Sequence, residues 1–176
     1  QVFVLPVVGA IADRSSHKRR LLAVFAYAGA LATMSYLFIT GDRYLLGGLL
    51  FLLANIAFGA SIVVYNSFLP YLAGPDDRDK VSSIGWAMGY VGGGVLLAIN
   101  LGALIAGGDE NSGLIARWSL VSAGVWWAVF TTLPLKRLNE RPASACEARG
   151  GVLTDGFRQL GRTLRGLKAY PLTLFF

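Results

Sequence analysis

Charge is scarce in this chain, and long stretches have almost none. Charged residues make up 15% of the 176 positions and hydrophobic residues 55%, an apolar share above that of an ordinary soluble domain. Four stretches contain no acid and at most one base: residues 21–40, 44–73, 81–107 and 114–135. Each is long enough to cross the hydrocarbon core of a bilayer, which takes ~20 helical residues, and a helix satisfies its backbone polar groups without water. We therefore predict an all-α integral membrane protein surrounded by the lipid bilayer.

Cysteine, histidine and intramembrane acids are equally rare. The single cysteine, Cys146, excludes an intrachain disulfide and a cysteine-cluster metal site. The one histidine, His17, lies in a basic loop, where it is most simply solvated. None of the four spans contains Asp or Glu, so this portion lacks a buried carboxylate that takes up protons. The residues form no cluster typical of catalysis or metal binding, and we expect no enzyme, no metal site and no cofactor.

The chain starts without Met, and both of its ends are apolar segments too short to span a bilayer. We therefore expect an internal piece of a larger membrane protein. Residues 1–135 would be part of an N-terminal transmembrane half, 136–168 a cytoplasmic basic linker, and 169–176 the start of the next transmembrane helix.

The net charge of +6 is distributed unevenly among the loops. Residues 13–20 hold four bases and one acid, 74–80 two bases and three acids, and 136–168 eight bases and three acids, whereas 108–113 hold two acids and no base. An excess of Lys and Arg marks cytoplasmic loops, and acids count for little. The first, third and fifth loops are therefore predicted inside. This explains the positive charge by orientation, and we expect no nucleic-acid partner.

Part of the basic linker has the pattern of an amphipathic helix. Its apolar residues recur at four- and three-residue spacing and its bases lie on another side; the apolar set is Phe157, Leu160, Leu164 and Leu167, and the basic set is Arg158, Arg162, Arg165 and Lys168. We predict a helix lying on the inner leaflet, with a solvated basic linker as the alternative.

Small and polar residues form stripes on the two middle spans. Spacings of seven, four and seven residues place each set on one helix face: Gly48, Asn55, Gly59 and Asn66 on the second span, and Ser82, Gly89, Gly93 and Asn100 on the third. Helix packing explains the glycines as well as a cavity does. The asparagines need partners in hydrocarbon, and Asn55 and Tyr90 fall near the middle of their spans, the depth at which transporters bind substrate. We therefore predict substrate contacts at Asn55 and Tyr90, and then at Asn100 and Asn66.

The stretch GAIADRSSHKRR resembles the signature loop of the major facilitator superfamily, which lies between family helices two and three. Gly9, Asp13 and Arg14 match it, whereas Ser16 replaces a glycine and His17 replaces a base. The resemblance implies a major-facilitator-type helical bundle, here from the end of helix two to the start of helix seven, with the four spans as helices three to six. It also implies that Gly9, Asp13 and Arg14 form a gating loop.

Three longer blocks resemble one branch of that superfamily. LANIAFGASIVVYNSFLPYLA, DKVSSIGWAMGYVGGGVLLAIN and GLIARWSLVSAGVWW occur in the order found in the vacuole effluxers, which are the autophagy-related permeases and their bacterial relatives. The fungal members of this branch are implied to export amino acids from the vacuole. The family fold also places helices four and five, which carry the polar stripes, beside the central cavity.

Two departures and one base refine the resemblance. The span 44–73 lacks the Arg that proton-coupled members often carry on helix four. The glycine pattern of antiporters on helix five is matched by Gly85, Gly89, Gly93 and Gly94, but Tyr90 stands where the pattern has proline. These glycines, with Gly59, keep a role in helix packing as their alternative. Arg117, near the outer start of the last span, either snorkels to the surface or meets a substrate carboxylate.

Together these patterns indicate a secondary active transporter of small solutes that works by alternating access, with amino-acid efflux as the specific form that the resemblance implies. The coupling ion, proton or sodium, stays open. The alternative is a non-transporting membrane scaffold or receptor whose stripes only pack helices. The Arg-rich composition favours a bacterial plasma membrane; a eukaryotic protein would lie in a vacuolar or organellar membrane.

Overall fold

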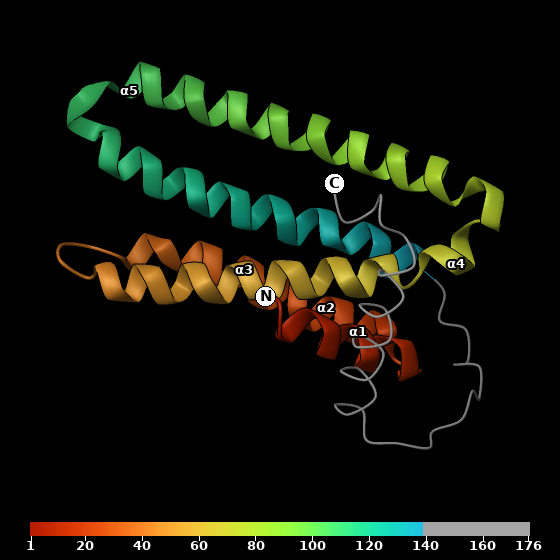
Figure 1. Cartoon of the computed structure of the whole chain (residues 1–176). Helices are drawn as coiled ribbons and strands as arrows, with labels where there is room; N and C mark the ends of the chain where they lie inside the picture. The colour runs from red at the N-terminus through yellow and green to blue at the C-terminus, as the bar shows by residue number, and fades with distance from the viewer. Residues whose placement is uncertain (139–176) are drawn as a thin grey trace, which may run out of the picture.

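The computed structural model describes residues 1–138, which are helical and contain no strand. The elements in chain order are α1 (Val4–Arg14), α2 (Lys18–Met34), η1 (Ser35–Phe38), α3 (Tyr44–Asn66), α4 (Leu69–Leu72), η2 (Pro75–Asp77) and α5 (Arg78–Arg137) (Figure 1). The all-α fold is confirmed. The amphipathic helix and the start of the next span were predicted for residues that lie outside this described range.

The long helix α5 is a hairpin of two limbs, residues 78–107 and 109–137. The backbone breaks at Gly108, which has φ 69° and ψ 172°, a left-handed φ that residues with a side chain rarely adopt. At Gly107 a Cβ atom would overlap the end of the Ile115 side chain, so the two limbs lie close together next to the turn. Asp109 and Glu110 begin the second limb, where the positive end of the helix dipole stabilises their carboxylates. The outer loop predicted over six residues is thus reduced to one sharp break.

Three helical segments are long and apolar enough to cross a membrane: Lys18–Phe38, Tyr44–Leu72 and Pro75–Arg137. The third folds back at Gly108, so the described residues contain four long helical limbs at the positions of the four predicted spans. The turn 15–17, the segment α4–η2 and the end of α5 lie at one end of the bundle, and the α2–α3 loop and the turn of the α5 hairpin lie at the other (Figure 1). We call the first the inner end, because its loops are those predicted to be cytoplasmic.

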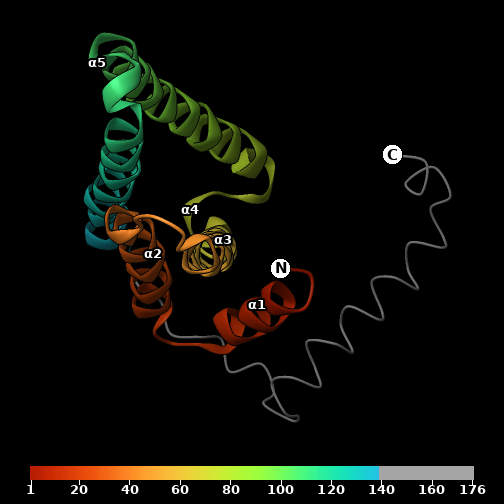
Figure 2. The same cartoon turned by 90° about the vertical axis from the view of Figure 1, so that its left-hand side faces the viewer.

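Helix α2 lies between α3 and the second limb of α5, and very small residues allow its close contact with that limb (Figure 2). A Cβ atom on Gly124 would lie 2.8 Å from the backbone oxygen of Ala30 and 2.6 Å from Cγ of Met34. A Cβ on Gly29 would collide with the ring of Trp127. Burial away from water does not drive helices together inside a bilayer, so their association depends on close packing. Small residues at the contact allow the two backbones to approach.

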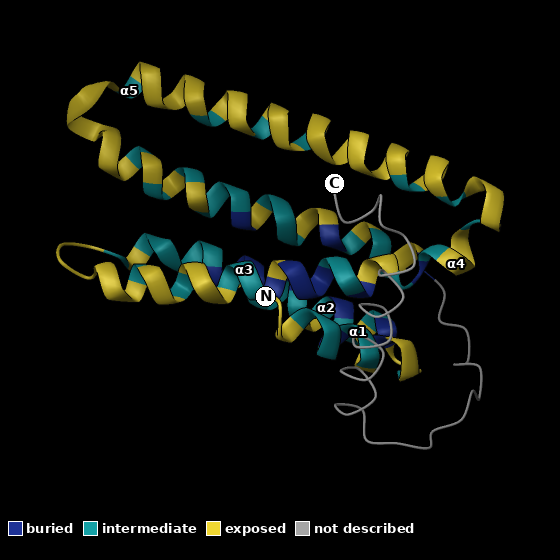
Figure 3. Cartoon of the chain, viewed as in Figure 1, coloured by how far each residue is buried: buried dark blue, intermediate teal, exposed yellow. Residues whose placement is uncertain are grey.

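A cluster of buried apolar residues lies in the inner half. It comprises Val8, Ala12, Leu22, Ala60, Val64, Phe68 and Leu138, which join α1, α2, α3 and the end of α5, and further buried alanines lie along α2 and α3. The first limb of α5, in contrast, has no buried residue among those that the structure describes, and its outward faces are exposed along its length (Figure 3).

Gly124→Ala tests the contact between α2 and the second limb. The added methyl group meets the backbone of Ala30 and Met34 as well as the Met34 side chain, and the backbone cannot move aside easily, so we expect the folded state to lose roughly 1–3 kcal/mol. Gly94→Ala is the matched control, because a Cβ there meets no atom within 4 Å. Thermal unfolding of the full-length protein in detergent measures both variants; equal melting temperatures would contradict the contact.

Candidate functional site

A cavity of about 410 Å³ opens between the inner half of α3, with α4, and the inner half of the first limb of α5. Its wall consists of Phe58, Ile62, Tyr65, Asn66, Leu69 and Leu72 on one side and Val81, Ser82, Gly85, Trp86, Gly89 and Tyr90 on the other. The two helices are those that the family resemblance places beside the central cavity. The volume is in the range of small-molecule sites.

The cavity wall is aromatic and uncharged, with a few polar groups that have no partner. The rings of Trp86 and Tyr90 lie 6.2 Å apart between centroids and are tilted by 35°. Across the cavity, Phe58 is held edge-on by Trp127, with 5.7 Å between the ring centroids. Within residues 1–138, the side chains of Asn66, Ser82 and Tyr90 make no hydrogen bond to the protein. Polar groups without a hydrogen-bond partner in the protein can bind a solute.

The structure separates the two residues predicted near mid-membrane. Tyr90 lies on the cavity wall, but Asn55 does not: its backbone oxygen and its Oδ1 each accept a hydrogen bond of 2.9 Å from Nε2 of Gln1. Gly59 belongs to the same contact, because a Cβ there would lie 3.0 Å from Cδ2 of Leu5. This part of the α3 stripe therefore packs against the start of the chain and α1. A role for Asn55 in substrate binding stays a prediction.

Asn100 likewise has its partners inside the protein. Its amide donates to Oγ of Ser122 at 3.0 Å, and the Ser122 hydroxyl lies 3.1 Å from Oδ1 of Asn100, across the two limbs of α5. Hydrogen bonds of this kind fix the register of neighbouring helices in hydrocarbon. Arg117 is half-buried on the second limb and is not part of the cavity wall. Substrate contacts by either residue stay predictions.

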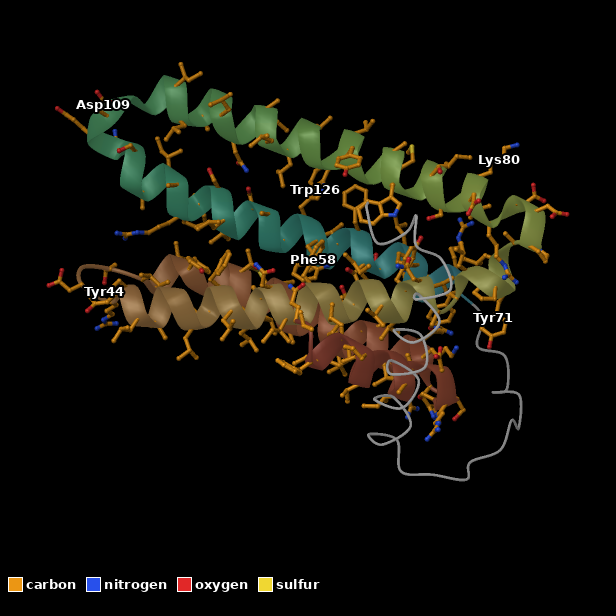
Figure 4. All side chains as sticks on the ribbon, viewed as in Figure 1. Tyr44, Phe58, Tyr71, Lys80, Asp109 and Trp126 are labelled. Atoms are coloured by element: carbon orange, nitrogen blue, oxygen red, sulfur yellow. The ribbon has the colours of Figure 1, made fainter. Side chains whose placement is uncertain are left out.

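The glycines of the first limb divide into two groups that the sequence pattern did not distinguish. Gly85, Gly89, Gly93 and Gly94 each have no atom within 4 Å of a built Cβ, so they pack against nothing within the described residues. In the middle of the limb, Gly92 faces the second limb: a Cβ on it would lie 3.9 Å from Nε1 of Trp126, which projects into the space between the limbs (Figure 4). Residues with the seven–four–seven spacing lie on one face of the helix. Gly92 lies on the adjoining face and is not part of that pattern.

Two bases of the opening loop are fixed at the inner end of the bundle. Lys18 is 8% exposed, and its Nζ lies 5.1 Å from the ring centroid of Tyr71 on α4, an attractive cation–π contact. Arg19 donates from Nη2 to the backbone oxygen of Leu135 in the last turn of α5. The last carbonyls of a helix have no partner within it and carry negative partial charge, so a guanidinium stabilises them. The charge pattern of the sequence predicted only the orientation of this loop, and no sequence signal indicated either contact.

The gating candidates lie beside this assembly. Asp13 is exposed near the end of α1 and makes no hydrogen bond or ion pair within residues 1–138, whereas Gly9 faces α3: a Cβ atom on it would lie 3.5 Å from Cγ1 of Val63. The two departures from the family pattern contact each other, since Oγ of Ser16 lies 3.0 Å from Nδ1 of His17. The carboxylate is thus open to a partner beyond the described residues, and its gating role stays a prediction.

Arg19→Met removes the guanidinium while keeping much of the side chain's apolar length. We expect a loss of about 1–2 kcal/mol of stability, because the carbonyl end of α5 loses a charged hydrogen-bond donor. Arg20→Met, on an exposed base next to it, controls for the loss of charge alone. Chemical unfolding of the two variants in detergent would give equal midpoints if the Arg19 contact contributed nothing.

Comparisons with known proteins match the whole chain to one family. The family described as "Vacuole effluxer Atg22 like" matches residues 1–176. Autophagy-related protein 22-1 of Penicillium rubens is 28% identical over 234 residues, which cover 93% of this chain and 39% of the relative. The uncharacterized MFS-type transporter YxiO of Bacillus subtilis is 25% identical over 175 residues, covering 97% of this chain and 40% of the relative.

A further relative, Autophagy-related protein 22 of Gibberella zeae, is 46% identical over 72 residues, 41% of this chain. No solved structure matches. The chain spans about two fifths of the length of the first two relatives. The sequence blocks, the membrane-length helices and these relatives agree: this is an integral membrane protein that belongs to the vacuole effluxer Atg22-like family, which has fungal and bacterial members of the major facilitator type.

Proposed function

We propose that the full-length protein is a secondary active transporter that moves small solutes across a membrane by alternating access. The observation that carries the proposal is the cavity between α3 and the first limb of α5, which is of solute size and presents polar groups that have no hydrogen-bond partner within residues 1–138. Because the chain spans about two fifths of its relatives, the remaining helices would complete the site from the other side. Alternation requires that the solute bind the two states of the completed site differently.

Amino acids are the solute class that we propose. The family is described as a vacuole effluxer, and fungal relatives are autophagy-related proteins, which supports export of small metabolites. The cavity wall offers apolar surface with the amide of Asn66 and the hydroxyls of Ser82 and Tyr90, and it contains no charged side chain. Such a wall suits the side chain of an amino acid. Its ammonium and carboxylate groups would be held by residues outside those described.

A gating role for the opening loop completes the proposal. Asp13, with Gly9 and Arg14, lies at the inner end, where Lys18 and Arg19 tie the loop to α4 and to the end of α5. In one state the exposed Asp13 carboxylate would accept hydrogen bonds from the N-terminus of a helix in the other half. The positive end of the helix dipole lies there and favours an anion. Breaking that contact would accompany opening toward the inside.

Transport itself is tested by reconstituting the full-length protein in liposomes and measuring uptake of a panel of labelled amino acids, peptides and sugars. We expect saturable flux of at least one amino acid above that of protein-free liposomes. A protein that is folded and correctly inserted but moves no member of the panel would instead favour the scaffold or receptor. Flux of only sugars or peptides would keep the transporter and overturn the amino-acid assignment.

Asp13→Asn tests the gate. The substitution keeps the shape of the side chain and removes its charge, so we expect transport to slow roughly tenfold if about 1.4 kcal/mol of stabilisation is lost in one state. Insertion and the apparent KM should change little. Asp42→Asn, on an exposed acid at the opposite end, is the control. Equal rates for wild type and both variants would contradict a gating role for Asp13.

A further inference from the structure

Two glycines form a bare strip of helix backbone in the wall of the cavity. Gly85 and Gly89 are one helical turn apart on the first limb of α5, and both line the cavity. A Cβ atom on either would meet no atom within 4 Å, so a side chain there would project into open space. Glycines that serve helix contacts in this structure differ, as Gly29 and Gly124 show, because a Cβ on them would overlap the neighbouring helix.

Bulky side chains surround this strip. Trp86 and Tyr90, each one position after a glycine, form a tilted ring pair beside it. Phe58, Ile62 and Tyr65 project from α3 on the other side of the cavity. The glycine strip is therefore the part of the first limb where a solute group can approach the helix backbone, with aromatic rings at its side. A methyl group added at the strip would remove that space without disturbing any protein contact within the described residues.

We infer that Gly85 and Gly89 determine the largest apolar group that the transporter accepts. This inference rests on the proposed transport function and adds to it a specificity-determining pair. The solute's apolar group lies against the two glycines and between the aromatic side chains, and its polar groups lie toward Asn66, Ser82 and the remaining helices. The wall contains no charged side chain, so selection on this side is by size and shape.

The test measures liposome uptake of L-alanine, L-leucine, L-phenylalanine and L-tryptophan by the full-length wild type and by Gly85→Ala, Gly89→Ala and Gly89→Val. One methyl group in an apolar pocket changes discrimination by about tenfold or more. We expect Gly85→Ala and Gly89→Ala to reduce tryptophan uptake by about that factor while alanine uptake stays within roughly twofold. Gly89→Val should extend the loss to phenylalanine and leucine.

Gly93→Ala is the matched control. Gly93 is on the same helix one turn beyond Gly89 and has equally open space at its Cβ, but it does not line the cavity. Its variant should keep the wild-type ratio of tryptophan to alanine uptake. Expression and melting temperature are measured for every variant, so that a folding defect is seen separately from a change in selectivity.

The outcomes distinguish the inference from the function on which it rests. Loss that grows with solute size in the Gly85 and Gly89 variants, and not in Gly93→Ala, supports the inference. A wild type that transports while the Gly85 and Gly89 variants lose all four solutes equally overturns the inference and leaves the transporter. A folded wild type that transports no amino acid overturns the proposed function, and the inference with it.

Discussion

Polar groups cannot find water in hydrocarbon, and this constraint organises the spans of the protein. Hydroxyls inside the helices bond back to carbonyls of the preceding turn, as Thr33 does to Gly29 and Thr131 does to Trp127. The side-chain oxygen of Asn55 accepts a hydrogen bond from Gln1, and the amide of Asn100 bonds to Ser122 across the two limbs of α5. Asn66, Ser82 and Tyr90, which make no hydrogen bond within residues 1–138, lie on the cavity wall. Because unsatisfied polar groups are costly in an apolar medium, they favour this wall as the place where the proposed solute, or water, would bind.

Glycine serves two purposes in this structure: it allows close helix packing, and it keeps the cavity open. Gly29 and Gly124 bring α2 and the second limb of α5 into backbone contact, which gives the bundle a tight seam. Gly85 and Gly89 keep space open on the first limb. The seam and the cavity lie on different limbs of one hairpin, so the sharp break at Gly108 lets a single stretch of helix serve both purposes. Asn100 and Ser122 hold the two limbs in register.

The inner end connects the parts that alternating access would move. Lys18 contacts α4 through Tyr71, and Arg19 contacts the end of α5, so the short turn after α1 is joined to two separate segments of the half. Basic residues are required here by membrane orientation alone. Arg19 has a second role, because its positive charge lies at the carbonyl end of α5, where a cation is stabilising. A displacement of this turn would therefore change the contact between Lys18 and α4, which borders the cavity.

The sequence by itself was enough to predict a membrane protein with four long apolar helices and to identify its family, because uncharged stretches and motif blocks are local properties of the chain. It also placed polar and small residues on one face of two helices, since helical periodicity is local as well. Which of those residues share a space was decided by tertiary structure. Asn55 and Asn66 have nearly the same angle on α3, yet one faces Gln1 and the other the cavity, because the neighbours of a helix change along its length. Gly92 and Gly93 are adjacent, and only the packing of the second limb separates the glycine beside Trp126 from the one in open space.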